Sequence, residues 1–405
     1  MAARSRLPRR RFGIFRGCSE ALPCLGRELA ATFPPRQSAT YGASDKGSAC
    51  GQLAYRYRYV AFDQRNKYSM VAPQLSKRIQ IARYLMVCGI VFIHIPPVET
   101  EIVTNNTYFL MFRAFWVDAV FRGTVPVLTC ISAYLIFRSS KDKKAFALIK
   151  DKAESLLLPM VIWNLPIVLA IYLVQRYTAV GYPFRLNLNP IDVLTWVDAT
   201  LGITDRPANF PLFFLRDLFV LAVLAPIFGF LIRTAPLIGL AMVGVIFWFD
   251  LDGLLLLRSS MALNFYIGGL IAVYGWNLFW LDKYKWGMLV LFVAVCVIKS
   301  QTPGDSTLFR VVSPFIIWPV LALIENTRFA DFVVKLSPGS FFLFLAHAPL
   351  LIGSYIMYQR FPIVDYPLYW FISSATVILL CALAYMIASK TLPSTMQVAL
   401  GGRWS

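Results

Sequence analysis

Charged residues are scarce in this sequence, because Asp, Glu, Lys and Arg together make up only 15% of its 405 residues. Soluble globular domains contain about 25% of these residues. The mean hydropathy is +0.62, and 58% of the residues are hydrophobic. A single soluble core stops growing near roughly 250–300 residues, so one core does not bury this much apolar chain. The composition therefore excludes an ordinary soluble protein and indicates one that lies in a lipid bilayer.

Clustered metal ligands are also missing. The seven cysteines are scattered, and none forms a CxxC or CxxH pair. Four of them lie inside apolar runs, where cysteine behaves as a small hydrophobic residue. A zinc site or a disulfide framework is therefore unsupported, and we expect no metal. The only two histidines of the chain are His94 and His347.

The first 69 residues differ from the rest of the chain because they are basic and contain no long apolar run. They hold 13 Lys or Arg against 4 Asp or Glu, and so carry +9 of the net charge of +18. We expect residues 1–69 to be a disordered basic extension, or to lie upstream of a true start at Met70. Residues 70–392 are then the transmembrane domain, and residues 393–405 are a short C-terminal tail.

Apolar runs follow one another closely after Met70, and most approach the roughly 17 to 25 residues that cross a bilayer core as a helix. They predict an all-α fold, a polytopic transmembrane helical bundle of about ten spans. The runs cover residues 78–96, 120–138, 156–175, 211–232, 235–249, 261–280, 285–299, 308–325, 339–359 and 367–389. The aromatic stretch 108–121 either lies in the membrane interface or begins the second span.

The orientation of the bundle follows from its basic loops, because Lys and Arg collect in the cytoplasmic loops of membrane proteins. The segment at the start of the first run contains Lys77 and Arg78, residues 138–152 hold six Lys or Arg, and residues 325–338 contain Arg328 and Lys335. These three segments are predicted to be cytoplasmic, and the loop with Glu99 and Glu101 is predicted to be outside. Ten spans then place both termini in the cytoplasm.

The first apolar run contains two ionisable residues, Arg83 and His94. Such groups are costly inside a membrane and are functional candidates for that reason. They are eleven residues apart, which is three helical turns plus roughly 20°. Both side chains are thus predicted to project from one helix face, roughly 16 Å apart along the axis. Arg83 lies near the inner surface, and His94 lies toward the outer half.

This spacing suits acyl transfer from a cytoplasmic thioester. A guanidinium binds phosphate groups bidentately, as acetyl-CoA would require, and a histidine deprotonates a hydroxyl near neutral pH. The alternative is structural: Arg83 snorkels to the inner headgroups, and His94 makes a hydrogen bond inside the bundle. The spacing alone leaves both interpretations open.

Four further motifs follow in order along the chain. They are Arg122–Pro126 leading into Ile131–Leu135, Lys152 with Leu156–Pro159 and Trp163, Phe213–Leu218, and Leu336–Ser337 leading to Phe342–Pro349. Together with Arg83 and His94 they resemble the membrane-bound acyltransferase-3 family, which includes bacterial exopolysaccharide, O-antigen and Nod-factor O-acetylases. The resemblance covers about residues 75–390. Ala133, Ser155 and Phe213 depart from the glycine, arginine and tryptophan usual in the family.

The resemblance implies an O-acyltransferase that moves an acyl group, expected to be acetyl, from cytoplasmic acetyl-CoA to a hydroxyl of an extracytoplasmic carbohydrate or lipid-linked sugar. The residues implied are His94, Arg83 and His347 as catalytic, and Arg216, Arg122 and Trp163 as substrate-binding. His94 either acts as a general base or carries the acyl group as a nucleophile. A bacterial inner-membrane location follows from the family, and we expect no nucleic-acid partner.

Other interpretations remain open at this point. A transporter or flippase for a glycolipid or small metabolite would also line its pathway with intramembrane Arg and His. A glycosyltransferase that uses a lipid-phosphate donor is more distant, and its metal or carboxylate site would have to lie in the predicted outer loops. Each predicted site residue also has a structural alternative: packing for His347 and Trp163, snorkelling for Arg122, and an ion pair with Asp217 for Arg216.

Overall fold

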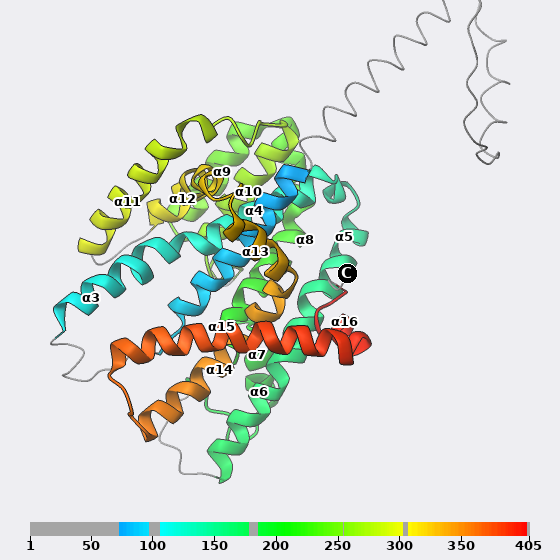
Figure 1. Ribbon diagram of the computed structural model, residues 1–405. Helices are drawn as coiled ribbons and strands as arrows, with labels where there is room; N and C mark the ends of the chain where they lie inside the picture. Colours follow the sequence, from blue (N-terminus) through cyan, green and yellow to red (C-terminus); the bar gives the residue numbers. More distant parts are fainter. Residues whose placement is uncertain (1–72, 97–105, 178–184, 254, 303–306, 403–405) are drawn as a thin grey trace, which may run out of the picture. The chain divides into compact units, whose positions relative to one another are not determined.

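The computed structural model describes residues 73–96, 106–177, 185–253, 255–302 and 307–402 (Figure 1). Every regular element in these residues is a helix, which confirms the predicted all-α fold. Residues 1–69, predicted to be a basic extension, lie outside the described residues.

The helices are joined by connections of very different lengths, from a single residue upward. The first covers residues 73–93. The others are α3 (Thr107–Arg113), α4 (Thr124–Arg138), α5 (Ala145–Lys152), α6 (Leu158–Tyr177), α7 (Val193–Leu201), α8 (Phe213–Thr234), α9 (Pro236–Trp248), α10 (Ser260–Val273), α11 (Lys285–Gln301), α12 (Thr307–Val320), α13 (Arg328–Leu336), α14 (Ser340–Arg360), α15 (Tyr366–Thr391) and α16 (Pro393–Ala399). Residues Ala114–Ala119 and Val120–Gly123 join α3 to α4 as π- and 3-10-helical turns.

Six helical stretches in the described residues are long and apolar enough to cross a membrane. They are Thr107–Arg138, Ala145–Tyr177, Phe210–Thr234, Asp282–Gln301, Arg328–Arg360 and Tyr366–Thr391. Shorter apolar helices cover Pro236–Trp248, Ser260–Val273 and Thr307–Leu323. Each of the ten predicted runs overlaps a helix. The number of spans and the side of the membrane on which the termini lie stay predictions. Residues 108–121 form the beginning of the long helical stretch Thr107–Arg138, which contains the second predicted run.

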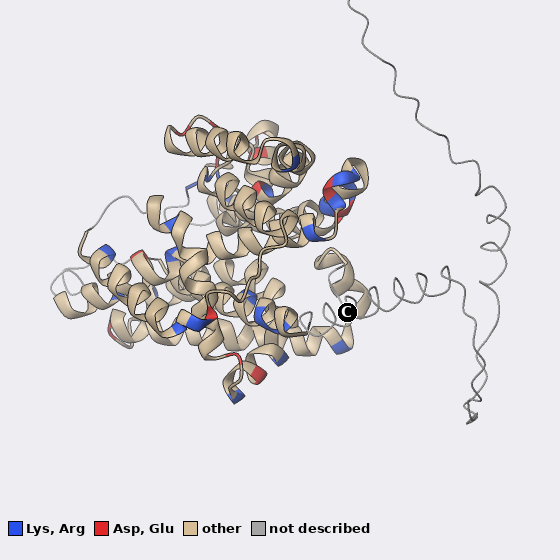
Figure 2. Cartoon of the chain, turned by 90° about the horizontal axis from the view of Figure 1, so that it is seen from above, with Lys and Arg blue, Asp and Glu red and all other residues tan. Residues whose placement is uncertain are grey.

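Apolar side chains cover much of the outer surface of these helices. Val290 and Ile298 on α11 and Leu379 and Ile387 on α15 are examples, each exposed. Figure 2 shows that most of the ribbon is neither basic nor acidic. Soluble monomers rarely expose apolar patches of this extent, whereas lipid tails solvate them. The described residues therefore form the helical bundle of a multi-pass membrane protein.

The centre of the bundle contains α4, α8 and α10, which pack against one another. Most residues of α10 are buried. Gly268 allows α10 to approach α4 closely, because a Cβ at this position would lie 2.5 Å from the carbonyl oxygen of Cys130. Small residues commonly mediate such contacts between membrane helices. At the edge, α14 lies beside α15 and α11 lies beside α12 (Figure 1).

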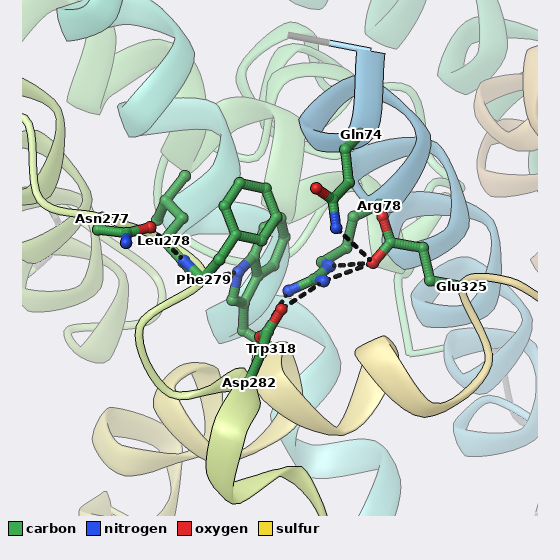
Figure 3. Close-up of polar contacts among 8 residues, drawn as sticks. All are labelled: Gln74, Arg78, Asn277, Leu278, Phe279, Asp282, Trp318 and Glu325. Atoms are coloured by element: carbon green, nitrogen blue, oxygen red, sulfur yellow. Dashed lines mark hydrogen bonds and ion pairs between the residues drawn. The ribbon is translucent and has the colours of Figure 1, made fainter. Parts of the chain in front are cut away.

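A buried ion cluster ties the first helix to the segments before α11 and after α12 (Figure 3). Arg78, with no exposed surface, donates to the two carboxylate oxygens of Asp282 at 2.8 and 2.7 Å and also to Glu325. Its guanidinium lies 4.6 Å from the ring centroid of Phe279 and 5.5 Å from that of Trp318. Two segments predicted to be cytoplasmic, at Arg78 and after Glu325, therefore meet in the fold.

Candidate active site

The two histidines of the chain, 253 residues apart in sequence, meet in the structure. His94 lies in the turn directly after the first helix, and its backbone N–H donates to the Val91 carbonyl at 3.1 Å. His347 lies inside α14 and is fully buried. His94 Nδ1 and His347 Nε2 are 3.0 Å apart, and the two rings stack with an interplanar angle of 25°. Both predicted histidines thus belong to one hydrogen-bonded pair.

The surroundings of His347 assign the hydrogen atoms of this pair. His347 Nδ1 lies 2.8 Å from the carbonyl oxygen of Phe344 and 3.2 Å from that of Leu343. Because a carbonyl oxygen only accepts, Nδ1 must carry the hydrogen. With both rings neutral, His347 Nε2 then accepts a hydrogen bond from His94 Nδ1–H. His94 Nε2 is left with a free lone pair, which can take a proton or attack a carbonyl carbon.

A network of amides fixes the segment before α8 next to the histidine pair. Asn209 donates from its side chain to the Leu345 carbonyl at 2.9 Å, two residues from His347 in α14. Its backbone N–H donates to the side-chain oxygen of Asn164 at 2.7 Å. The next residue, Phe210, contacts the His94 ring edge-on, with centroids 4.9 Å apart. Our sequence analysis missed Asn164, although a primary amide inside an apolar run is a signal for a buried polar contact.

A cavity of about 700 Å³ opens beside Arg83. Its positive charges come from Arg83, Lys141 and Lys152, and none of the described carboxylates lines it. Lys141 and Lys152 pair with Asp151 at 3.1 and 3.3 Å. Within the part of the chain that the structure describes, Arg83 forms no ion pair. The cavity therefore offers a guanidinium to an anionic ligand.

Phe344 connects this cavity to the histidine pair. Its ring lines the cavity and lies 6.0 Å from the His347 ring centroid, and it packs at 5.8 Å against Phe214, another lining residue. His94 and His347 do not themselves line the cavity. The structure thus puts Arg83 in the cavity and the histidines beyond Phe344, rather than all three in one open space.

Arg216 lies outside the cavity lining and holds two loops against α8. Its guanidinium donates to the carbonyl oxygens of Ile203, at 3.2 Å, and of Leu255. It also pairs with Asp217 at 3.0 Å, although the two residues are adjacent on a helix. These contacts correspond to the structural alternative for this residue and do not test a substrate-binding role.

Trp163 and Arg122 also lie outside the cavity lining. The indole N–H of Trp163 donates to the Ala399 carbonyl at 3.2 Å, and its ring packs edge-on against Phe342 at 5.5 Å. Trp163 therefore helps to seat α16, a helix within the predicted C-terminal tail, on α6. Arg122 pairs with Asp118 at 3.1 Å.

Possible metal ligands do not gather in the described residues, where no group of three or more His, Cys, Asp or Glu side chains could hold an ion. The described cysteines, Cys88, Cys130, Cys296 and Cys381, are all free thiols. The hydrogen-bonded pair of histidines, with its lone pair on His94 Nε2, is the candidate active site.

Comparison with known proteins supports the same region. Residues 76–386 match the family model of the acyltransferase domain. The chain is also 29% identical over 346 residues to the succinoglycan biosynthesis protein ExoH of Rhizobium meliloti, an alignment that covers 81% of this chain and 93% of the relative. No solved structure matches this chain. Since the family match spans most of the chain, from before Arg83 to beyond His347, this protein belongs to the acyltransferase-3 family of membrane acyltransferases.

Proposed function

We propose that this protein is an O-acyltransferase of the bacterial inner membrane. It moves an acyl group, expected to be acetyl, from cytoplasmic acetyl-CoA to a hydroxyl of an extracytoplasmic carbohydrate. The observation that carries the proposal is the hydrogen bond between His94 and His347, at the end of the helix that also carries Arg83 into a cationic cavity. Membership of an acyltransferase family supports the reaction. The relative is a succinoglycan biosynthesis protein, which supports a polysaccharide acceptor.

The cavity beside Arg83 suits the donor. Acetyl-CoA carries its phosphate groups at one end and its thioester at the other end of a flexible pantetheine arm. Arg83 can bind a phosphate bidentately, and Lys141 and Lys152 add positive charge around it. The basic loop that holds both lysines is predicted to face the cytoplasm, where acetyl-CoA is made. The arm then extends toward Phe344, which we expect to change rotamer so that the thioester reaches the histidine pair.

His94 Nε2 takes the proton of the acceptor hydroxyl as the hydroxyl oxygen attacks the thioester carbonyl. The C–O bond forms, the C–S bond breaks, and the proton passes from His94 to the leaving CoA thiolate. His347 keeps the His94 ring oriented by accepting from Nδ1–H throughout. In the second route His94 attacks first and carries the acyl group on Nε2. Mass spectrometry after incubation with acetyl-CoA but without acceptor distinguishes the two routes, because only the second route leaves an acyl group on His94.

The test is complementation of a deletion strain, with mass spectrometry of its surface polysaccharide. The wild-type gene should restore an acyl mass increment, and His94→Ala should not, at equal amounts of protein in the membrane. Lys77→Gln is the matched control on the same helix, because Lys77 pairs with Asp331 and lies outside the cavity lining. Undiminished acylation by the His94→Ala protein would remove the catalytic role of this residue.

A second measurement separates the enzyme from a transporter or flippase. The purified protein should release CoA from acetyl-CoA when a hydroxyl acceptor is present, whereas a transporter moves its cargo without consuming a thioester. Arg83→Gln should weaken binding of CoA by about 10- to 150-fold, since a hydrogen bond to a charged group is worth roughly 1.5–3 kcal/mol. Unchanged CoA affinity in this variant would argue against the cavity as the donor site.

A further inference from the structure

Three arginines from separate parts of the chain lie near His94, and a fourth lies near one of these three. They are Arg122 before α4, Arg206 before α8, Arg258 before α10 and Arg310 in α12. The charges of Arg122, Arg206 and Arg258 act electrostatically on His94, and those of Arg122, Arg206 and Arg310 act on Arg258. In the predicted topology all four belong to the extracytoplasmic side, opposite the basic cytoplasmic loops. We call this set the outer arginine cluster.

The position of Arg258 is fixed by contacts with the start of α8. Asp217 accepts hydrogen bonds at 3.1 Å from the backbone N–H groups of Arg258 and of the residue before it. The Arg258 guanidinium lies 5.2 Å from the ring centroid of Phe213. Phe210, three residues earlier, contacts the His94 ring. Arg258 and His94 therefore flank the same short segment at the entry of α8.

Arg122 and Arg310 are brought together by close packing of the turn before α4 against α12. A Cβ added at Gly123, next to Arg122, would lie 3.1 Å from Cβ of Ser313. Ser313 lies almost one turn after Arg310 in α12. Arg206 comes from the loop that the amide of Asn209 anchors to α14, and its side chain is exposed. The cluster is thus assembled from four elements around the histidine pair.

Among the described residues, the carboxylates beside this cluster already have partners, and Asp205, next to Arg206 in sequence, pairs with Arg185. Asp118 pairs with Arg122, and Asp217 already accepts from Arg216 and two backbone N–H groups. Within the described residues, neither Arg206 nor Arg258 forms an ion pair. Burial lowers the pKa of Arg258 to about 10, and the positive charges around it act in the same direction. These positive charges repel one another, and a bound anion relieves that repulsion.

We propose that the outer arginine cluster binds an anionic group of the acceptor, a carboxylate or a phosphate, and so holds the acceptor hydroxyl against His94. This inference rests on the proposed function. Guanidinium groups recognise both anions bidentately, through the same planar fork of N–H donors. The anion comes either from an acidic sugar residue or from the phosphate that links a sugar to a lipid. A neutral acceptor would leave Arg206 and Arg258 without an anionic partner among the described residues.

The test is a binding titration of the purified full-length protein in a non-ionic detergent without a sugar headgroup, read by thermal unfolding. Three probes are compared: a neutral cello-oligosaccharide, a glucuronate-containing oligosaccharide and farnesyl diphosphate. Stabilisation by the glucuronate oligosaccharide alone assigns the anion to the sugar, and stabilisation by farnesyl diphosphate alone assigns it to the lipid linkage. Binding of the neutral oligosaccharide as tightly as both anionic probes would overturn the proposal.

Substitutions in the outer arginine cluster test whether these arginines bind the anionic probes. Arg206→Gln combined with Arg258→Gln should weaken binding of the anionic probe at least tenfold and leave binding of CoA unchanged. Arg83→Gln should do the reverse, which separates the two sites. Arg206→Gln alone alters an exposed side chain, so it keeps the test valid if the double variant does not fold. If the folded variants bound the anionic probes as tightly as the wild type does, the proposal would also be overturned. If the wild type did not bind CoA, that result would count against the donor cavity and not against the arginine cluster.

Discussion

At the scale of single residues, the candidate site depends on one imidazole orienting another. A carboxylate often plays the orienting part beside a catalytic histidine, but a carboxylate carries a charge that is costly to bury among apolar side chains. Neutral His347 accepts from His94 Nδ1–H without such a charge, and its own Nδ1–H is bound by the Phe344 carbonyl. A second histidine therefore suits a site inside an apolar helix bundle.

We expect His347→Ala to lower acyl transfer by about 5- to 150-fold, because an unmade hydrogen bond at a buried group costs roughly 1–3 kcal/mol. His94→Ala should cost more, about 10²- to 10⁴-fold, as for a lost general base. The measurement is CoA release by purified protein, together with the KM for acetyl-CoA, which should not change in either variant.

His347→Gln is the informative companion to the alanine variant. Its amide oxygen can accept from His94 Nδ1–H, so it should recover part of the lost rate if His347 acts by positioning His94. Equal rates for the alanine and glutamine variants, at equal thermal stability, would contradict the positioning role.

At the scale of helices, two devices hold the elements that carry the site. One is the close approach of α10 to α4 at Gly268, and the other is the buried cluster of Arg78, Asp282 and Glu325. At Gly268 the absence of a side chain lets the two backbones approach closely. The ion cluster joins the N-terminal end of the first helix to two segments distant in sequence. Disruption of either contact should lower the stability of the protein.

Gly268→Ala should destabilise the protein by about 1–3 kcal/mol, the usual cost of overpacking, because its Cβ would meet the Cys130 carbonyl oxygen. The thermal unfolding midpoint in detergent measures this effect. Gly244→Ala and Gly353→Ala are matched controls, since a Cβ at either position meets nothing within 4 Å. They should leave the midpoint unchanged or slightly higher, and a similar drop in all three variants would refute the packing explanation.

Glu325→Ala should destabilise the protein by about 3–5 kcal/mol, because it leaves part of the charge of buried Arg78 uncompensated. Asp331→Ala breaks the ion pair with Lys77, in which the Asp331 side chain is 62% exposed, and should cost less than about 1 kcal/mol. Unfolding midpoints of the two variants are compared under identical conditions. Equal midpoints would show that the buried cluster contributes no more than a surface pair.

At the scale of the whole molecule, the first helix joins two sites of different character. Arg83 faces a wide cationic cavity next to loops predicted to be cytoplasmic, and His94 ends the same helix near the outer arginine cluster. The donor and the acceptor would then approach the histidine pair from opposite sides of the membrane. An acyl group would cross the bilayer through the protein, while CoA stays in the cytoplasm.

Cysteine accessibility tests this arrangement in a variant without the seven native cysteines. Ser139→Cys lies in the cavity lining and should react with a membrane-impermeant maleimide only in inverted vesicles. Ile203→Cys, at an exposed position near the arginine cluster, should react in intact cells. Labelling of both positions from the same side would contradict the predicted orientation.

The sequence by itself determined that the chain is all-α and lies in a membrane, because bilayer thickness sets a run length that is visible locally. The ordered motifs around Arg83, His94 and His347 also indicated the family. Arg216 and Trp163 were predicted to bind substrate, and this stays a prediction; in the structure Arg216 holds two loops and Trp163 contacts α16. A sequence motif does not distinguish substrate binding from a structural contact, because both need the same polar group at the same position.

Only the tertiary structure decided which distant residues meet. The hydrogen bond between His94 and His347, the convergence of three arginines on His94 and the burial of Arg78 between two acids all join segments far apart in sequence. Such contacts depend on the crossing angles and the rotation of packed helices. The crossing angles and rotations are set by how side chains pack across the whole bundle, and Gly268 against α4 is one example. The spacing of apolar residues along a single helix does not determine them.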